Sequence, residues 1–106
     1  MKNLEIDEKI DELIAEKEIV IFQFGTETCA PCSAIKQKID HWIENHKEIK
    51  SRYVSIEKFP EIAAEYGIFS APTIVVFISG KLSIRESGYF SLDDIFKRIE
   101  RYVEMI

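Results

Sequence analysis

Apolar residues form two different patterns along the chain, a helical spacing and short continuous runs. A helical spacing, with an apolar residue at every third or fourth position, predicts helices over residues 7–16, 31–43, 60–66 and 91–103. Runs of β-branched and aromatic residues between and after them predict strands over residues 19–24, 51–56, 73–78 and 82–86. Residues 2–6 offer a further short edge strand, so the predicted order is (β)αβαβαββα.

This order defines an α/β fold. The run at 19–24 is almost continuously apolar, which is typical of a central strand covered on both faces. Ser79-Gly80 separates the last two strands and predicts a hairpin. We therefore expect one domain over residues 1–106, with a mixed sheet of four to five strands, helices on both faces and right-handed crossovers.

Several helix ends are marked by residues with defined capping roles. Asp7 is a candidate N-cap for the first helix, and Pro31 suits the first turn of the second. Gly67 supplies a stop after the third helix. Ser91, three residues before Asp94, predicts an acidic capping box at the start of the last helix.

Composition narrows the classes of function. The chain has 106 residues, of which 46% are hydrophobic and 31% charged, with a net charge of −5. Acidic and basic residues are interleaved, which argues against a nucleic-acid surface and a polybasic membrane anchor. Met1–Glu8 carries acidic residues where a signal peptide needs an apolar core, and no run approaches transmembrane length. We expect a cytoplasmic protein that binds neither nucleic acid nor membrane.

The strongest chemical signal is Cys29-Ala30-Pro31-Cys32, between the central strand and a helix. These are the chain's two cysteines, and so short a loop is a poor staple because it removes little entropy from the unfolded chain. Unpaired amides at a helix N-terminus favour a thiolate, and cysteines in such surroundings have pKa values of roughly 3.5 to 7.5. Cys29 is therefore a candidate nucleophile, and Cys32 can capture its mixed disulfide.

Two plainer interpretations of the pair are weaker. Buried cysteines often act as small hydrophobic residues, but Pro31 and the helix onset argue against inert thiols here. His41 and His46 complete a spacing that superficially resembles a zinc site. The helix would carry both histidines away from its N-terminal end, so we expect no metal.

A second signal is Ser70-Ala71-Pro72-Thr73, directly before the strand at 73–78. Proline cannot donate to a sheet ladder, so Pro72 must open the strand or adopt a special backbone state such as a cis bond. Only about 5 to 6% of X-Pro bonds are cis, so this segment alone favours trans. The cysteine pair changes that expectation.

Together these features resemble the thioredoxin family over nearly the whole chain. The motifs occur in the family's order: Cys-x-Pro-Cys at 29–32, Tyr66-Gly67-Ile68, Ala71-Pro72-Thr73, Gly80 and Gly88. The resemblance implies a thioredoxin fold and a cis Ala71–Pro72 bond facing the cysteines. It also implies an exposed nucleophile, Cys29, and a resolving thiol, Cys32.

The resemblance further implies how substrate is bound and what is exchanged. A shallow groove for an extended polypeptide is expected from Thr28, Ala30, Pro31, Pro72 and Gly88, and the backbone of Ala71 would pair with the substrate like a strand. The implied activity is reduction of protein disulfides, with no cofactor beyond the Cys29–Cys32 disulfide. The implied partners of this monomer are disulfide-containing client proteins and a reductase or other thiol electron donor.

Three alternatives remain beside that activity. A binding or chaperone module of the same fold would use its thiols only secondarily. A metal or cluster site shared across a dimer would show bound metal. A glutathione-dependent variant is disfavoured because Gly88-Tyr89 resembles thioredoxins more than glutaredoxins.

The chain departs from the family at positions around the cysteines. Gln23 replaces a buried acid and Tyr53 replaces the lysine paired with it, so both members of the pair are absent together. Because an amide accepts no proton at ordinary pH, we expect Gln23 to flatten the pH dependence of the resolving step.

Other departures lie on the surface around the motif. Gly25 and Thr28 replace tryptophans, and Ala30 replaces a glycine between the cysteines. Gln37 stands where the family has a kinking proline, which predicts a straighter helix. Glu27, beside the motif, is a candidate to raise the pKa of Cys29 by like-charge repulsion.

Overall fold

The computed structural model describes residues 1–105 and contains four helices and four strands over that range. In chain order they are α1 (Ile10–Glu16), β1 (Ile19–Gly25), α2 (Ala30–Ile43), β2 (Lys50–Ser55), α3 (Pro60–Glu65), β3 (Thr73–Ile78), β4 (Lys81–Ser87) and α4 (Leu92–Met105). All eight lie where the apolar spacing predicts them, with ends that differ by a few residues.

The strands form one mixed sheet in the order β2-β1-β3-β4. β1 runs parallel to β2 and antiparallel to β3, and β3 and β4 form the predicted hairpin through Ser79-Gly80. The predicted α/β class and mixed sheet are therefore confirmed. Of residues 2–6, only Asn3 pairs, in an isolated parallel bridge to Tyr53. The possible edge strand is thus a single bridge, and the sheet has four strands over the described residues.

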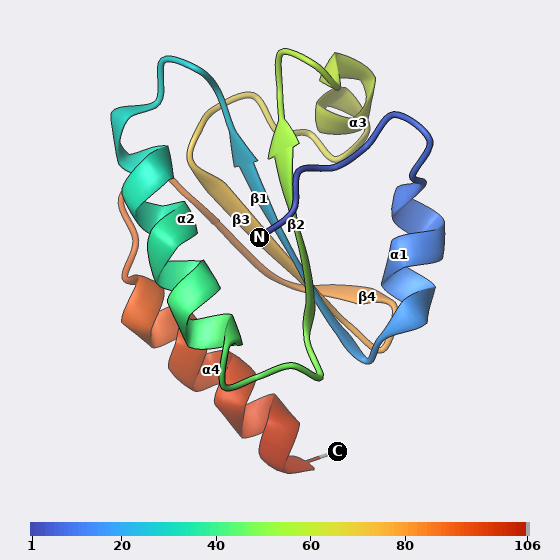
Figure 1. Cartoon of the computed structure of the whole chain (residues 1–106), viewed down its shortest axis with the longest axis vertical. Coiled ribbons are helices and arrows are strands. Elements are labelled where there is room, and N and C mark those ends of the chain that lie inside the picture. The colour runs from blue at the N-terminus through green and yellow to red at the C-terminus, as the bar shows by residue number, and fades with distance from the viewer. Residues whose placement is uncertain (106) are drawn as a thin grey trace.

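Helices cover both faces of the sheet, with α2 and α4 on one side and α1 and α3 on the other (Figure 1). Alternate residues of β1 divide between the two resulting cores. Val20, Phe22 and Phe24 pack in the core under α1 and α3. Ile19 and Ile21 pack in the core under α2 and α4. The nearly unbroken apolar run of β1 is explained by this double coverage.

One predicted cap is wrong and another is confirmed. Asp7 lies in a turn in which the Glu8 amide donates to the Glu5 carbonyl at 3.1 Å. Helix α1 therefore begins at Ile10, after Lys9, with no side-chain cap. At α4, the Asp94 amide donates to Ser91 Oγ at 3.1 Å, which confirms Ser91 as the capping side chain.

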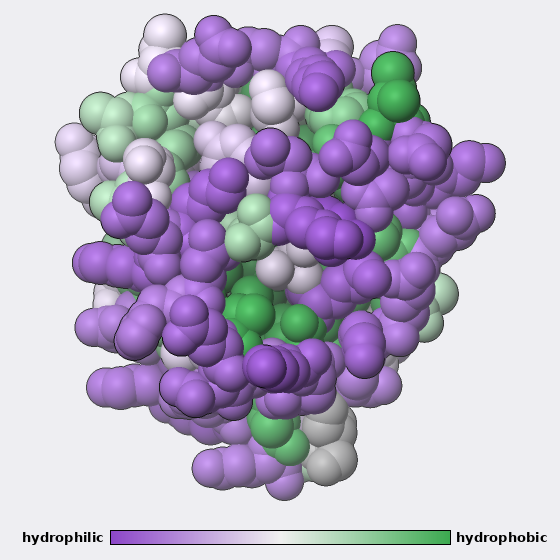
Figure 2. Space-filling view, in the orientation of Figure 1, coloured by the Kyte–Doolittle hydropathy of each residue, from purple (hydrophilic) through white to green (hydrophobic). Residues whose placement is uncertain are grey.

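The surface is mainly hydrophilic on the face seen in Figure 2, and it is paler, hence less hydrophilic, over the beginning of α2. Within residues 1–105, no helix combines the length and apolar character needed to cross a membrane.

Candidate active site

The two cysteines lie at the junction of β1 and α2. Cys29 is the N-cap residue of α2 and is half-buried, whereas Cys32 in the first turn is only 2% exposed. The two are joined in a disulfide, with their Cα atoms 5.4 Å apart. Because α2 begins at Ala30, Cys29 stands at the end of the helix where the first backbone amides have no partner within the helical ladder. Cys29 thus has the more accessible sulfur, and a helix N-terminus favours the thiolate form of a cysteine placed there.

Pro72 lies at the start of β3, and the Ala71–Pro72 peptide bond is cis. The Pro72 carbonyl accepts the amide hydrogen of Gly88 at 3.0 Å, which ties the two segments together. Gly88 has φ of +75°, a conformation that glycine adopts without steric cost. The segment is also held by Thr73 Oγ1, which donates to the Ser70 carbonyl at 2.8 Å.

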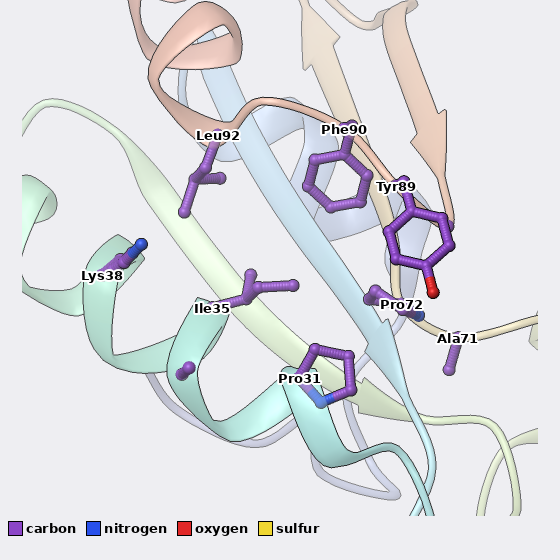
Figure 3. A pocket seen from close by; sticks show the side chains of 10 residues that line it. Pro31, Ile35, Lys38, Ala71, Pro72, Tyr89, Phe90 and Leu92 are labelled. Atoms are coloured by element: carbon purple, nitrogen blue, oxygen red, sulfur yellow. The ribbon is translucent and has the colours of Figure 1, made fainter.

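A groove of about 540 Å³ runs between the start of α2 and the segments around Pro72 and Gly88. Figure 3 shows Pro31 and Ile35 of α2 on one side and Pro72, Tyr89 and Phe90 on the other. Four of the residues predicted to bind substrate line this groove together: Pro31, Ala71, Pro72 and Gly88. Thr28 and Ala30 are exposed nearby but are not among its lining residues.

Sequence reasoning did not assign six of the lining residues to this groove: Ala34, Ile35, Lys38, Tyr89, Phe90 and Leu92. Two of them, Tyr89 and Lys38, are polar-tipped side chains outside the apolar core. Tyr89 is fully exposed at the rim, and Lys38 of α2 lines the same groove. An aromatic residue directly after Gly88 and outside any apolar repeat was the usable signal for Tyr89. Lys38 gave none, because a lysine on a helix is ordinarily a solvated surface residue.

Gln23 connects the central strand to the cysteine pair. It is fully buried, and its Nε2 donates to the Cys32 carbonyl at 2.9 Å. Its Oε1 is the one buried side-chain polar atom without a hydrogen-bond partner in the described part of the chain. A buried acceptor without a partner costs about 1–3 kcal/mol, and such exceptions are few in folded proteins.

Tyr53 and Gly25 form a second contact beside Cys32. Tyr53 of β2 is the register partner of Gln23. A Cβ atom added to Gly25 would overlap the Tyr53 hydroxyl and lie 3.1 Å from Cys32 Sγ. Burial raises the pKa of the Tyr53 phenol, and the Glu57 carboxylate raises it further. Lys36 of α2 lies over the Tyr53 ring, 4.9 Å from its centroid.

Glu27 lies on the surface beside the cysteine pair. Its side chain is exposed, and its amide donates to Glu57 Oε1 at 2.9 Å. Water and salt weaken the effect of an exposed carboxylate on a neighbouring sulfur. Its influence on Cys29 stays a prediction.

The histidines belong to a different part of the molecule. His46 stacks on Trp42 with ring centroids 4.0 Å apart, and its Nε2 lies 3.5 Å from Glu100 Oε2. His41 is exposed beside Glu44. Within residues 1–105, no group of three or more His, Cys, Asp or Glu side chains is placed to hold a metal ion.

Comparison with known proteins identifies the family. The chain matches the thioredoxin family profile over residues 2–101. A thioredoxin from Griffithsia pacifica is 38% identical over 72 residues, covering 67% of this chain and 66% of the relative. A chloroplastic M-type thioredoxin from Chlamydomonas reinhardtii is 29% identical, covering 92% of this chain and 71% of the relative.

Solved structures agree with the sequence relatives. The X-ray structure of Fasciola hepatica thioredoxin superposes with a TM-score of 0.76 at 28% identity, covering 85% of this chain and 88% of that chain. The chain belongs to the thioredoxin family, and its fold and Cys29–Cys32 pair are consistent with a thiol–disulfide oxidoreductase.

Proposed function

We propose that this chain, acting as a single monomeric domain, reduces disulfides in client proteins by dithiol–disulfide exchange. The observation that carries the proposal is the difference between the two sulfurs: Cys29 is accessible at the helix N-cap, and Cys32 is buried within bonding distance of it. Such an arrangement suits one attacking and one resolving thiol.

The reaction has two exchange steps. The Cys29 thiolate attacks one sulfur of the client disulfide, forms a mixed disulfide and releases the other client sulfur as a thiolate. The Cys32 thiolate then attacks Cys29 Sγ, which forms the Cys29–Cys32 disulfide and releases the second client thiolate. Two electrons pass to the client, and both released thiolates take protons from water. The second step is fast because the helix holds Cys32 at a high effective concentration.

The groove provides a docking surface for the client. An extended segment lying along it would meet the apolar sides of Pro31, Ile35 and Phe90, with the Ala71 backbone available for strand-like pairing. Tyr89 adds a large aromatic surface at the rim. Recognition of this kind depends mainly on the client backbone and tolerates many sequences.

The catalytic cycle needs an external electron donor, a reductase or another thiol, that reduces the Cys29–Cys32 disulfide after each turnover. A cytoplasmic location supports this cycle because that compartment keeps thiols reduced. The Chlamydomonas relative is chloroplastic, so the family is not confined to the cytoplasm.

The test is an insulin-disulfide reduction assay with dithiothreitol, comparing wild type with Cys29→Ser and Cys32→Ser. We expect wild type to accelerate reduction and both variants to lose turnover. Cys32→Ser alone should accumulate a covalent adduct, because it attacks but cannot resolve. Tyr66→Phe, on the opposite face of the sheet, is the control and should retain full activity.

Two results would count against the proposal. A wild-type rate no greater than that of dithiothreitol alone would remove the reductase assignment. Client binding that survives replacement of both cysteines by serine, combined with absent turnover, would favour the binding or chaperone module.

A further inference from the structure

Position 25 has no room for a side chain larger than that of glycine. Its φ lies outside the left-handed region, so any residue satisfies its backbone conformation. What excludes a side chain is the Tyr53 hydroxyl, which lies 1.9 Å from the position that a Cβ atom would take, and Cys32 Sγ lies 3.1 Å from the same position. The carboxyl end of β1 therefore leaves a space at Gly25, and the Tyr53 phenol of the neighbouring strand β2 fills it.

Cys32 needs help to ionise. It is 2% exposed, and burial disfavours a thiolate relative to a thiol. The fully buried side chain of Gln23 donates to the Cys32 backbone carbonyl and cannot accept a proton. The resolving step nevertheless requires the thiolate of this sulfur.

We propose that, in the reduced protein, the Tyr53 hydroxyl donates a hydrogen bond to Cys32 Sγ and so favours the thiolate that resolves the mixed disulfide. The inference rests on the proposed exchange reaction and adds a residue to its second step. Hydrogen bonding to the charged form of a group lowers the pKa of that group. Burial keeps the phenol protonated, so it stays a donor across the physiological range.

The proton balance of the step is simple. The Cys32 thiol gives its proton to water, and the resulting thiolate accepts the hydrogen bond from Tyr53. As the thiolate attacks Cys29 Sγ, the bond from Cys29 to the client sulfur breaks. The client thiolate leaves with the electron pair and takes a proton from water. Tyr53 keeps its own proton throughout.

Other charged groups surround the phenol and must be held constant in any test. Lys36 of α2 lies over the ring, and Glu57 follows β2. Glu27 and Lys58 line a pocket together with Tyr53. Tyr53→Phe retains the ring and all four of these charges, so it removes only the hydroxyl.

The experiment follows reduced protein mixed with the aromatic disulfide DTNB in a stopped-flow instrument. The first nitrothiobenzoate released reports attack by Cys29, and the second reports attack by Cys32 on the mixed disulfide. Both phases are measured between about pH 6 and about pH 10, the span in which thiols titrate. The second phase does not depend on DTNB concentration, which separates the two steps.

In Tyr53→Phe we expect the midpoint of the second phase to rise by about one pH unit, as for loss of one hydrogen bond to a charged group. Below the midpoint the rate should fall roughly threefold, because about tenfold less thiolate is partly offset by the higher nucleophilicity of a more basic thiolate. For the same reason the variant should be roughly threefold faster at the alkaline end. The two profiles therefore cross, and the first phase stays unchanged.

Tyr66→Phe is the matched control, since Tyr66 is also half-buried with a pKa raised by burial but packs against Phe77 on the opposite face. It should reproduce both wild-type profiles. Superimposed second-phase profiles of Tyr53→Phe and wild type would overturn the inference and leave the proposed function intact. Equal slowing at every pH would also overturn it, as the sign of a packing defect. Release of only the first nitrothiobenzoate by wild type would instead overturn the proposed function.

Discussion

The two faces of the sheet have different compositions although the same strand, β1, contributes to both. The core under α1 and α3 is apolar, with Phe22 and Phe77 in edge-to-face contact at 5.8 Å. The face under α2 and α4 begins the same way with Ile19 and Ile21. At the carboxyl end of β1, however, that face places the fully buried amide of Gln23 on the first turn of α2.

Side chains on one face of β1 therefore contribute mainly to the stability of the fold, and the other face ends beside the cysteine pair. Because successive side chains of a strand point to opposite faces, Phe22 and Phe24 stabilise the fold while Gln23 between them reaches the cysteine pair. The second face accepts an orphaned Gln23 Oε1, a cost of about 1–3 kcal/mol that the first face avoids. Substitutions on the first face should therefore change the free energy of unfolding, and substitutions on the second face should change the kinetics of thiol exchange.

The largest expected effect is on the apolar face. Phe22→Ala removes a ring that is 1% exposed, and we expect it to lower the free energy of unfolding by about 3–5 kcal/mol. The pH profiles of thiol exchange in the remaining folded protein should be unchanged. Urea unfolding measures the first quantity and DTNB kinetics the second, with Ile6→Ala, at an 89% exposed position, as the control. A shifted exchange profile in Phe22→Ala would show that the two faces are not separable.

Gln23→Asp should have the next largest effect, and it should depend on pH. A carboxyl at this fully buried position has a raised pKa, so the folded state resists ionisation. Below the ordinary aspartate pKa near ~4 the carboxyl is protonated in both the folded and the unfolded state, so its ionisation does not change the free energy of unfolding. As pH rises above that value, the free energy of unfolding of the variant falls. The loss is about 1.4 kcal/mol for each pH unit by which the folded-state pKa exceeds the unfolded-state pKa. Urea unfolding at mildly acidic and mildly alkaline pH measures the difference, which wild type should lack at this position.

The same variant tests the proposed resolving step. A buried carboxylate introduces a second ionising group beside Cys32, so the second DTNB phase of Gln23→Asp should show a steeper or two-step pH dependence than that of wild type. Gln23→Asn, which adds no ionising group, is the control for the shorter side chain. Identical pH profiles for Gln23→Asp and wild type would contradict the expectation that Gln23 flattens this dependence.

The fold was largely predictable because its signals are local. The apolar spacing predicts all eight elements, and the hairpin follows from Ser79-Gly80, whose residues adopt φ of 52° and 80°. Asp7 failed as a cap because the side chain of Glu8 organises the preceding turn, accepting the Glu5 amide at 2.9 Å. That contact competes with capping and is not visible in a spacing pattern.

The site was only partly predictable because its important contacts cross between strands. Cys29 and Cys32 are identified by their spacing, and the family resemblance adds Pro72. Along the sequence, the replacements at Gly25 and Tyr53 stand apart, as a lost tryptophan and a lost lysine. Only the register of β1 with β2 brings the phenol into the space above Gly25 and makes the two replacements one arrangement.

The smallest expected effect is again on the apolar face, at its edge. Arg52 of β2 donates to Glu8 through Nε at 3.0 Å and Nη2 at 2.9 Å. The Arg52 hydrogen bonds, aided by the Glu5 amide, hold the pKa of Glu8 below its ordinary value of 4.5. A lowered folded-state pKa contributes stability above the ordinary value, and this contribution is lost as pH falls through the folded-state pKa.

Glu8→Gln should therefore lower the free energy of unfolding by about 1 kcal/mol at neutral pH. The effect is this small because both side chains are partly exposed, and solvent screens their attraction. The difference from wild type should shrink as pH falls below 4.5, and thiol exchange should not change at any pH. Glu44→Gln, in the largely exposed pair with His41, is the control and should have almost no effect. A Glu8→Gln difference that grows toward acid pH would contradict the lowered pKa of Glu8, whereas a shifted exchange profile would mean that the edge of this face communicates with Cys32 through β2.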